Sequence, residues 1–73
     1  MKMELSLDLQ ADALYIKFQA GKFATNKRID GDTIIDLDAN GRLLGIEIPN
    51  VTRKIPTKDL SDVSVKLPLR AWS

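Results

Sequence analysis

Apolar and polar residues alternate one by one near the start of the chain. Residues 3–9 place Met or Leu at every odd position, with Glu, Ser or Asp between them, and residues 13–18 repeat the pattern. A period of two is typical of a β-strand with one buried face. Residues 9–12 then form a hairpin loop, in which the Asp8 side chain is placed to accept hydrogen bonds from the turn backbone.

The alternation also predicts how these two strands pair. A four-residue loop joins apolar residues on one face and sets Glu4 opposite Lys17 on the other face. Pairs of both kinds stabilise an antiparallel ladder. The expected apolar pairs are Leu7 with Leu14, Leu5 with Ile16, and Met3 with Phe18.

Residues 21–29, which read GKFATNKRI, are a weaker candidate strand. Lys27 falls on the same side as Phe23, Thr25 and Ile29, and a central strand would seldom point a lysine inward. We therefore expect an edge strand that is protected by charge. The Asp-Gly-Asp sequence at residues 30–32 then predicts a turn.

Residues 36–47, which read DLDANGRLLGIE, match the calcium-loop pattern D-x-[DN]-x-[DN]-G-x5-E. Such a loop needs a helix on each side, whereas both flanks here contain Gly, Pro or β-branched residues. On a strand, moreover, Glu47 would lie about 20 Å from the turn. The Asn-Gly pair at residues 40–41 indicates a type I′ hairpin turn. We therefore favour a β-hairpin over a calcium site.

A two-residue Asn-Gly turn sets the register of this hairpin. It pairs Leu37 with Leu44 and Ile35 with Ile46 on one apolar face. A three-residue loop would instead pair Leu37 with Leu43 and mix the two faces, so burial favours the shorter loop.

The opposite face of the hairpin places Ile34 and Leu43 beside Gly45. Scattered apolar residues on a solvated face are common, and coverage of these two by a second chain is the alternative. A glycine here lets another backbone come close. Because the core is small and no disulfide supports it, we expect a homodimer, formed either through this face or through the edge of the C-terminal segment.

Prolines and β-branched residues are frequent from Pro49 onward, and they leave room for one helical turn near residues 58–61, capped by Thr57. Residues 63–67 alternate again and are a candidate last strand, at an edge because Pro68 lacks a backbone donor; residues 68–73 are a candidate loose tail. The chain is thus predicted to be mainly β, with a small α+β fold as the alternative. We expect one domain over residues 1–73, with a single curved antiparallel sheet of five or six strands built from hairpins.

Composition narrows the chemistry that the chain can perform. The 73 residues include no cysteine and no histidine, and the net charge is +1. Disulfides, thiolate metal sites and the commonest general base are thereby excluded. No apolar run has the length of a membrane span, and the N-terminal residues do not form a signal-peptide pattern. We expect a cytoplasmic protein that uses no cofactor or metal and no membrane.

Two stretches, DLQADALYIKF and IIDLDANGRLLGIEI, resemble the family catalogued as domain of unknown function 2283, which comprises short bacterial and archaeal proteins. The matching elements are a strand at residues 12–16, an Asp-x-Asp-x-x-Gly turn at residues 36–41, and Gly-Ile-Glu-Ile at residues 45–48. Family members commonly have Leu where this chain has Pro49. The resemblance implies a small β-rich fold and no known activity. Some members are encoded beside small toxin-like proteins, which implies an antitoxin-like binding role.

A pair of carboxylates is the candidate for catalysis. Asp36 and Asp38 lie about 7 Å apart along one strand, which is near the spacing of a glycosidase pair. Carboxylates beside an Asn-Gly turn are ordinary turn chemistry, however, and so short a chain has little room for a cleft. We therefore expect no enzyme.

Two basic clusters are candidates for phosphate contacts with RNA or DNA, although solubility and edge protection explain them as well. Tyr15 is the one aromatic residue placed to stack on a base. We expect a non-enzymatic module that binds a small protein partner, with weak nucleic-acid binding as the alternative. The clusters are Arg53, Lys54 and Lys58, and Lys22, Lys27 and Arg28. The candidate partner contacts are Tyr15, Ile34, Leu43, Arg53, Lys54 and Trp72.

Overall fold

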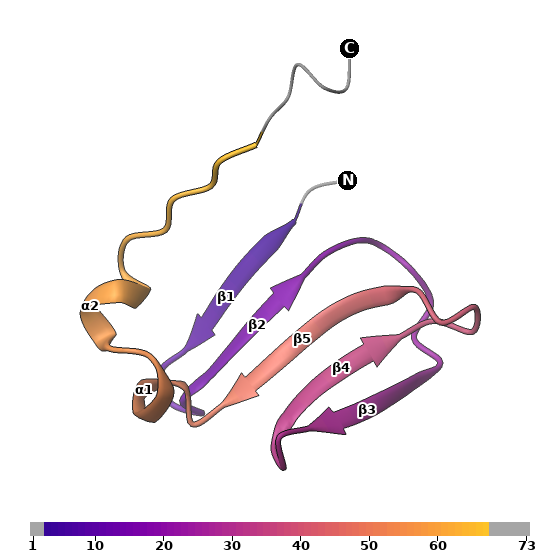
Figure 1. The fold of residues 1–73 in the computed structure, drawn as a ribbon, viewed down its shortest axis with the longest axis horizontal. Coiled ribbons are helices and arrows are strands. Elements are labelled where there is room, and N and C mark those ends of the chain that lie inside the picture. Colours follow the sequence, from indigo (N-terminus) through magenta and orange to yellow (C-terminus); the bar gives the residue numbers. More distant parts are fainter. Residues whose placement is uncertain (1–2, 68–73) are drawn as a thin grey trace.

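The computed structural model describes residues 3–67, which form one antiparallel sheet followed by two short helical turns (Figure 1). The prediction of a mainly β fold is confirmed, with five strands. The elements in chain order are β1 (Glu4–Asp8), β2 (Ala13–Lys17), β3 (Thr25–Ile29), β4 (Thr33–Leu37), β5 (Leu43–Pro49), α1 (Val51–Lys54) and α2 (Thr57–Leu60).

The strands lie in the order β1-β2-β5-β4-β3, and all neighbours are antiparallel. The β1–β2 hairpin has the predicted register, with Leu7 opposite Leu14. Asp8 Oδ1 accepts hydrogen bonds from the N–H groups of Gln10 and Ala11 at 3.0 and 3.1 Å, as predicted for this loop. β3 is an edge strand, also as predicted.

The β4–β5 hairpin is confirmed, but its predicted two-residue turn is wrong. The loop has three residues, 39–41, and the Asp38 N–H closes it by donating to the Arg42 carbonyl at 3.0 Å. Gly41 has a φ of 81°, whereas Asn40 is not in the positive-φ region. These angles fit a type I turn followed by a left-handed glycine, and not a type I′ turn, which needs positive φ at both central residues.

The longer loop also changes the register next to it. Leu37 lies opposite Leu43, whereas Ile35 lies opposite Ile46 as predicted. β5 therefore has one extra residue between these two pairs, which is a β-bulge. The bulge prevents the mixing of faces that a three-residue loop would otherwise cause. Ile34 lies opposite Glu47, as predicted, whereas Leu43 lies opposite Leu37 and not opposite Asp38.

Two helical turns follow β5, where one was predicted. α2 lies one residue before the predicted turn, and the predicted Thr57 cap is wrong: Thr57 is the first helical residue, and Pro56 occupies the N-cap position. α1 was not predicted, because β-branched residues such as Val51 and Thr52 are poor helix formers. It forms because its residues are held by the rest of the fold.

α1 is bonded to both the β1–β2 loop and the β3–β4 turn, at one end of the sheet. The Thr52 N–H and Oγ1 donate to the Asp12 carboxylate at 3.2 and 3.0 Å, in the β1–β2 loop. Lys54 Nζ donates to Asp32 Oδ2 at 2.9 Å, in the β3–β4 turn, and to the Pro49 carbonyl at 2.8 Å. Tertiary contacts thus override the low helix propensity of this segment.

Residues 62–67 form no strand, so the sheet has five strands in the described part of the chain. In Figure 1 this segment continues from α2 in the direction opposite to β1 and apart from it. The predicted tail, residues 68–73, lies outside the described residues.

The core is small and lies toward two corners of the sheet. The buried apolar residues are Leu14, Leu44 and Val51, and Val51 is completely buried. Leu44, the extra residue of the bulge, packs against the 18–24 connection, where a Cβ on Gly21 would collide with its side chain. Among the described residues, no helix or connection crosses the middle of the sheet in Figure 1.

Candidate functional site

One face of the sheet carries a row of apolar residues from edge to edge. Directly paired residues share a face, and successive pairs from β1 to β3 define this row. We call it the isoleucine row: Leu5, Ile16, Ile46, Ile35 and Lys27. Its one charged member, Lys27, lies on the edge strand β3.

This apolar face is open to solvent to an unusual degree for a core face. Ile16, Ile35 and Ile46 are only half-buried, and Leu5 on β1 is 48% exposed. A sheet normally covers its apolar face with a second layer. Within residues 3–67, α1 and α2 lie at one end of the sheet and no element covers the centre of the face (Figure 1).

An apolar groove runs along the β1 side of the same face. Its volume is about 310 Å³. The sheet and the segment after β5 both contribute to its walls. The lining residues are Leu5, Leu7, Leu14, Ile55, Asp59, Leu60 and Val63.

On the opposite face, which we call the closed face, the side chain of Tyr15 crosses a neighbouring strand. Tyr15 on β2 donates from its hydroxyl to Asp36 Oδ2 on β4 at 3.1 Å. Its ring passes over Gly45 of β5, where an added Cβ would lie 2.6 Å from Tyr15 Cζ and closer to the hydroxyl. The sequence predicted that Gly45 admits a second backbone; the structure shows that it admits the tyrosine of its own chain.

The Tyr15 hydroxyl is held in its protonated form. Burial raises the pKa of Tyr15, and the hydrogen bond to Asp36 and the negative charges of Asp36 and Glu47 raise it further. The phenol therefore acts as a donor to a carboxylate, which orders this face and offers no free base.

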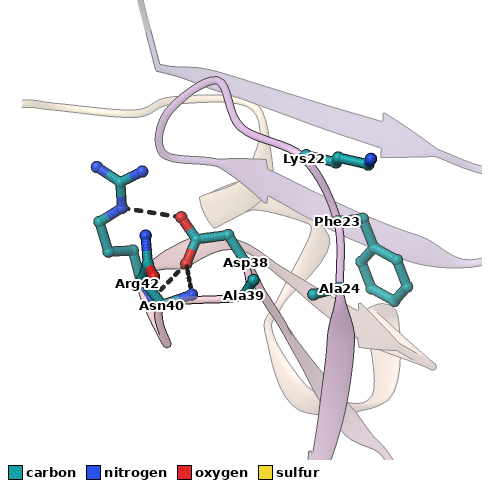
Figure 2. Close-up of a pocket in the computed structure, with 7 residues that line it drawn as sticks. All are labelled: Lys22, Phe23, Ala24, Asp38, Ala39, Asn40 and Arg42. Carbon is teal, nitrogen blue, oxygen red and sulfur yellow. Dashed lines mark hydrogen bonds and ion pairs between the residues drawn. The ribbon is translucent and has the colours of Figure 1, made fainter.

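The Asp38 carboxylate organises the β4–β5 loop (Figure 2). Its Oδ1 accepts the N–H groups of Asn40 and Arg42, both at 2.9 Å, and its Oδ2 accepts Arg42 Nε at 2.8 Å. The side chain is only 6% exposed. The backbone N–H of Arg42 is the main reason that the pKa of Asp38 is lowered, with further lowering from the Arg42 guanidinium and the Asn40 N–H.

A cavity of about 320 Å³ adjoins this loop. Figure 2 shows the 22–24 segment along one side and the Asp38–Arg42 pair along the other. Both Asp38 oxygens are already occupied by donors, so this carboxylate serves turn formation. Within residues 3–67, no group of three or more acidic side chains is arranged to hold a metal ion. The cavity lining is Lys22, Phe23, Ala24, Asp38, Ala39, Asn40 and Arg42.

The structure divides one predicted basic cluster and engages a member of the other. Lys27 pairs with Ile35 and Arg28 with Ile34, so these neighbours point to opposite faces of the sheet. Lys54 forms an ion pair with Asp32, and that bond lowers the pKa of Asp32.

The candidate partner contacts are dispersed over the fold. Tyr15 and Ile34 share the closed face, on either side of Glu47. Leu43 lies by the β4–β5 loop, and Arg53 and Lys54 are in α1. Trp72 lies outside the described residues. The open face itself was missed as a site, because its residues were predicted only as core; the signal was a core face with no second layer in so short a chain.

Fold and site together define a small single-sheet β protein with one open apolar face. The family model described as protein of unknown function (DUF2283) matches residues 5–51, more than half of the chain. The chain therefore belongs to this family, as its sequence resemblance indicated. No curated protein and no solved structure matches the chain. None of the helices in the described region is long and apolar enough to pass through a membrane.

Proposed function

We propose that the protein is a non-enzymatic binding module that holds a small protein partner on its open apolar face. The observation that supports this proposal is the isoleucine row, which spans all five strands and which no element of residues 3–67 covers at its centre. Exposed contiguous apolar surface on a soluble domain commonly marks an interaction site. The face is formed by strands and so is rigid before binding, which lowers the entropic cost of association.

The chemistry of the face indicates the kind of partner. Four of the five side chains in the isoleucine row are apolar, and the fifth, Lys27, ends the row at β3. An amphipathic segment with an apolar stripe and an acidic residue at one end complements this surface, as in groove-bound helices. The antitoxin-like role implied by the family resemblance is the case in which the segment belongs to a small toxin.

The carboxylates support a binding role over catalysis. Asp36 accepts the Tyr15 hydroxyl, and Asp38 accepts three donors of its own loop. A catalytic carboxylate must be within reach of a substrate proton or reacting atom, whereas both of these groups are engaged within the fold.

Two neighbouring charge reversals test the proposal. Lys27→Glu changes the open face, and Arg28→Glu makes the same charge change on the closed face of the same edge strand. With affinity-tagged chain and native lysate, we expect Lys27→Glu to lower partner capture several-fold and Arg28→Glu to leave it unchanged. Equal loss in both variants would contradict a face-specific protein contact.

Salt concentration distinguishes this proposal from nucleic-acid binding. Phosphate-driven binding falls steeply as ionic strength rises, whereas an apolar protein interface is much less sensitive. We expect the captured partner to be a protein that remains bound at high salt. Recovery of RNA or DNA that is lost at high salt would favour the alternative.

A further inference from the structure

The edge strand β1 has an open side, and the C-terminal segment of the chain has the sequence to fill it. β1 is the first strand of the sheet order, and within residues 3–67 it pairs only with β2. Residues 63–67 read Val-Ser-Val-Lys-Leu, and in the structure they form no strand. Val63, Val65 and Leu67 are 58%, 71% and 55% exposed. Such an alternating segment has the sequence pattern of a β-strand but has no neighbouring strand to pair with.

One antiparallel register matches this segment to β1 on both faces. It sets Val63 opposite Leu7 and Val65 opposite Leu5, on the open apolar face. It sets Lys66 opposite Glu4 on the other face, as an ion pair. A shift of one residue exchanges the faces, and a shift of two residues separates Lys66 from Glu4.

The sequence also indicates where this strand pairing begins and ends. Asp62 would lie opposite Asp8, where two carboxylates repel each other, so pairing begins at Val63 and residues 61–62 act as the hinge. Pro68 has no N–H to donate and ends the ladder.

Other edge pairings are less favourable. Two β1 strands pairing about Ser6 would place Glu4 of each chain against Asp8 of the other. The second edge strand, β3, carries Lys27 and Arg28 and would repel Lys66. Charge complementarity therefore selects β1 as the acceptor.

We propose that residues 63–67 of a second copy form this sixth strand, by a reciprocal exchange between two chains. Within one chain the segment leaves α2 apart from β1 (Figure 1), although Val63 borders the groove beside Leu5 and Leu7. Exchange puts the same contacts between chains, which is a common route to two-fold dimers. It adds a strand beside Leu5, at the β1 end of the isoleucine row, without covering the row, so it does not depend on the proposed partner site.

Mixing two charge-reversed variants tests the exchange. Glu4→Lys alone gives a dimer with two Lys–Lys contacts, and Lys66→Glu alone gives one with two Glu–Glu contacts. A one-to-one mixture forms a heterodimer in which both contacts join opposite charges. By sedimentation equilibrium we expect a wild-type dimer, a Kd raised by about tenfold in each single variant, and recovery of the wild-type Kd in the mixture.

Three outcomes would overturn the exchange. A wild-type chain that sediments as a monomer at high micromolar concentration would exclude the dimer. A dimer that tolerates both reversals would form through another surface. Weakening without recovery on mixing would place residues 63–67 on β1 of their own chain. As a matched control, Val65→Asp should dissociate the dimer, while Leu9→Asp, at a loop residue of equal exposure (70% against 71%), should not.

Discussion

Replacing Gly45 by alanine tests how the closed face of the sheet is held. The backbone of Gly45 is not in the positive-φ region, so alanine meets no intrinsic strain there. Its Cβ, however, would lie 2.6 Å from Tyr15 Cζ and 2.9 Å from the Ile16 carbonyl oxygen. The ring must move, and the Tyr15–Asp36 hydrogen bond is then lost.

The expected cost follows from these contacts. Overpacking costs about 1–3 kcal/mol, and loss of a hydrogen bond adds about 1 kcal/mol. The lower backbone entropy of alanine offsets about 0.5–1 kcal/mol. We expect a net loss of about 2 kcal/mol, which lowers the Tm by roughly 10 °C in a domain of this size.

Denaturant unfolding of a double-mutant cycle measures this effect. Tyr15→Ala alone removes the hydrogen bond and the ring. In that background Gly45→Ala should cost less than in the wild type, because the ring no longer obstructs the added Cβ and only the contact with the Ile16 carbonyl oxygen remains. Additive losses, or a Gly45→Ala variant as stable as the wild type, would refute the account of Gly45 as the passage for Tyr15.

Three further changes probe other parts of the fold. Val51→Ala should destabilise by about 2 kcal/mol by denaturant unfolding, because Val51 is completely buried; a loss near zero would contradict the role of α1 as an anchor. Gly41→Ala should cost about 1 kcal/mol by the same assay, because Gly41 has a φ of 81°. Folding lowers the pKa of Asp38 below its ordinary value of 3.8. The ionised Asp38 carboxylate therefore stabilises the fold fully above this ordinary pKa, and the stabilisation is lost as the pH falls toward the pKa of the folded state. Stability should therefore drop below about pH 4 in the wild type and drop less in Asp38→Asn, and equal pH profiles would contradict this.

The sequence predicted most of the strands because alternation over short runs is a local property. The β1–β2 register was predictable, since apolar pairs and the Glu4–Lys17 pair agree on it. The β4–β5 loop was not, because Asn-Gly favours a two-residue turn by local preference. The hydrogen bonds from Asn40 and Arg42 to Asp38 favour the three-residue loop, and the bulge at Leu44 makes it compatible with burial.

The remaining features depend on contacts between distant residues. α1 exists because Asp12 and Asp32 bind its residues, and helix propensity argued against it. Tyr15 was a candidate contact by residue type, and its hydrogen bond to Asp36 depends on the pairing of β2 with β5. Lys54 was chosen as a candidate contact by its residue type. The sequence alone could not show that Lys54 is bonded to Asp32 and Pro49 of its own chain.

The most direct test of the open face compares two adjacent isoleucines. Ile35 and Ile34 are both half-buried on β4, but they lie on opposite faces of the sheet. With the captured partner purified, calorimetric titration should show that Ile35→Ala raises the Kd by about tenfold, the equivalent of 1.4 kcal/mol. Ile34→Ala should leave the Kd within about twofold, as expected outside a contact. A Kd that responds equally to both changes, or only to Ile34→Ala, would contradict binding through the isoleucine row.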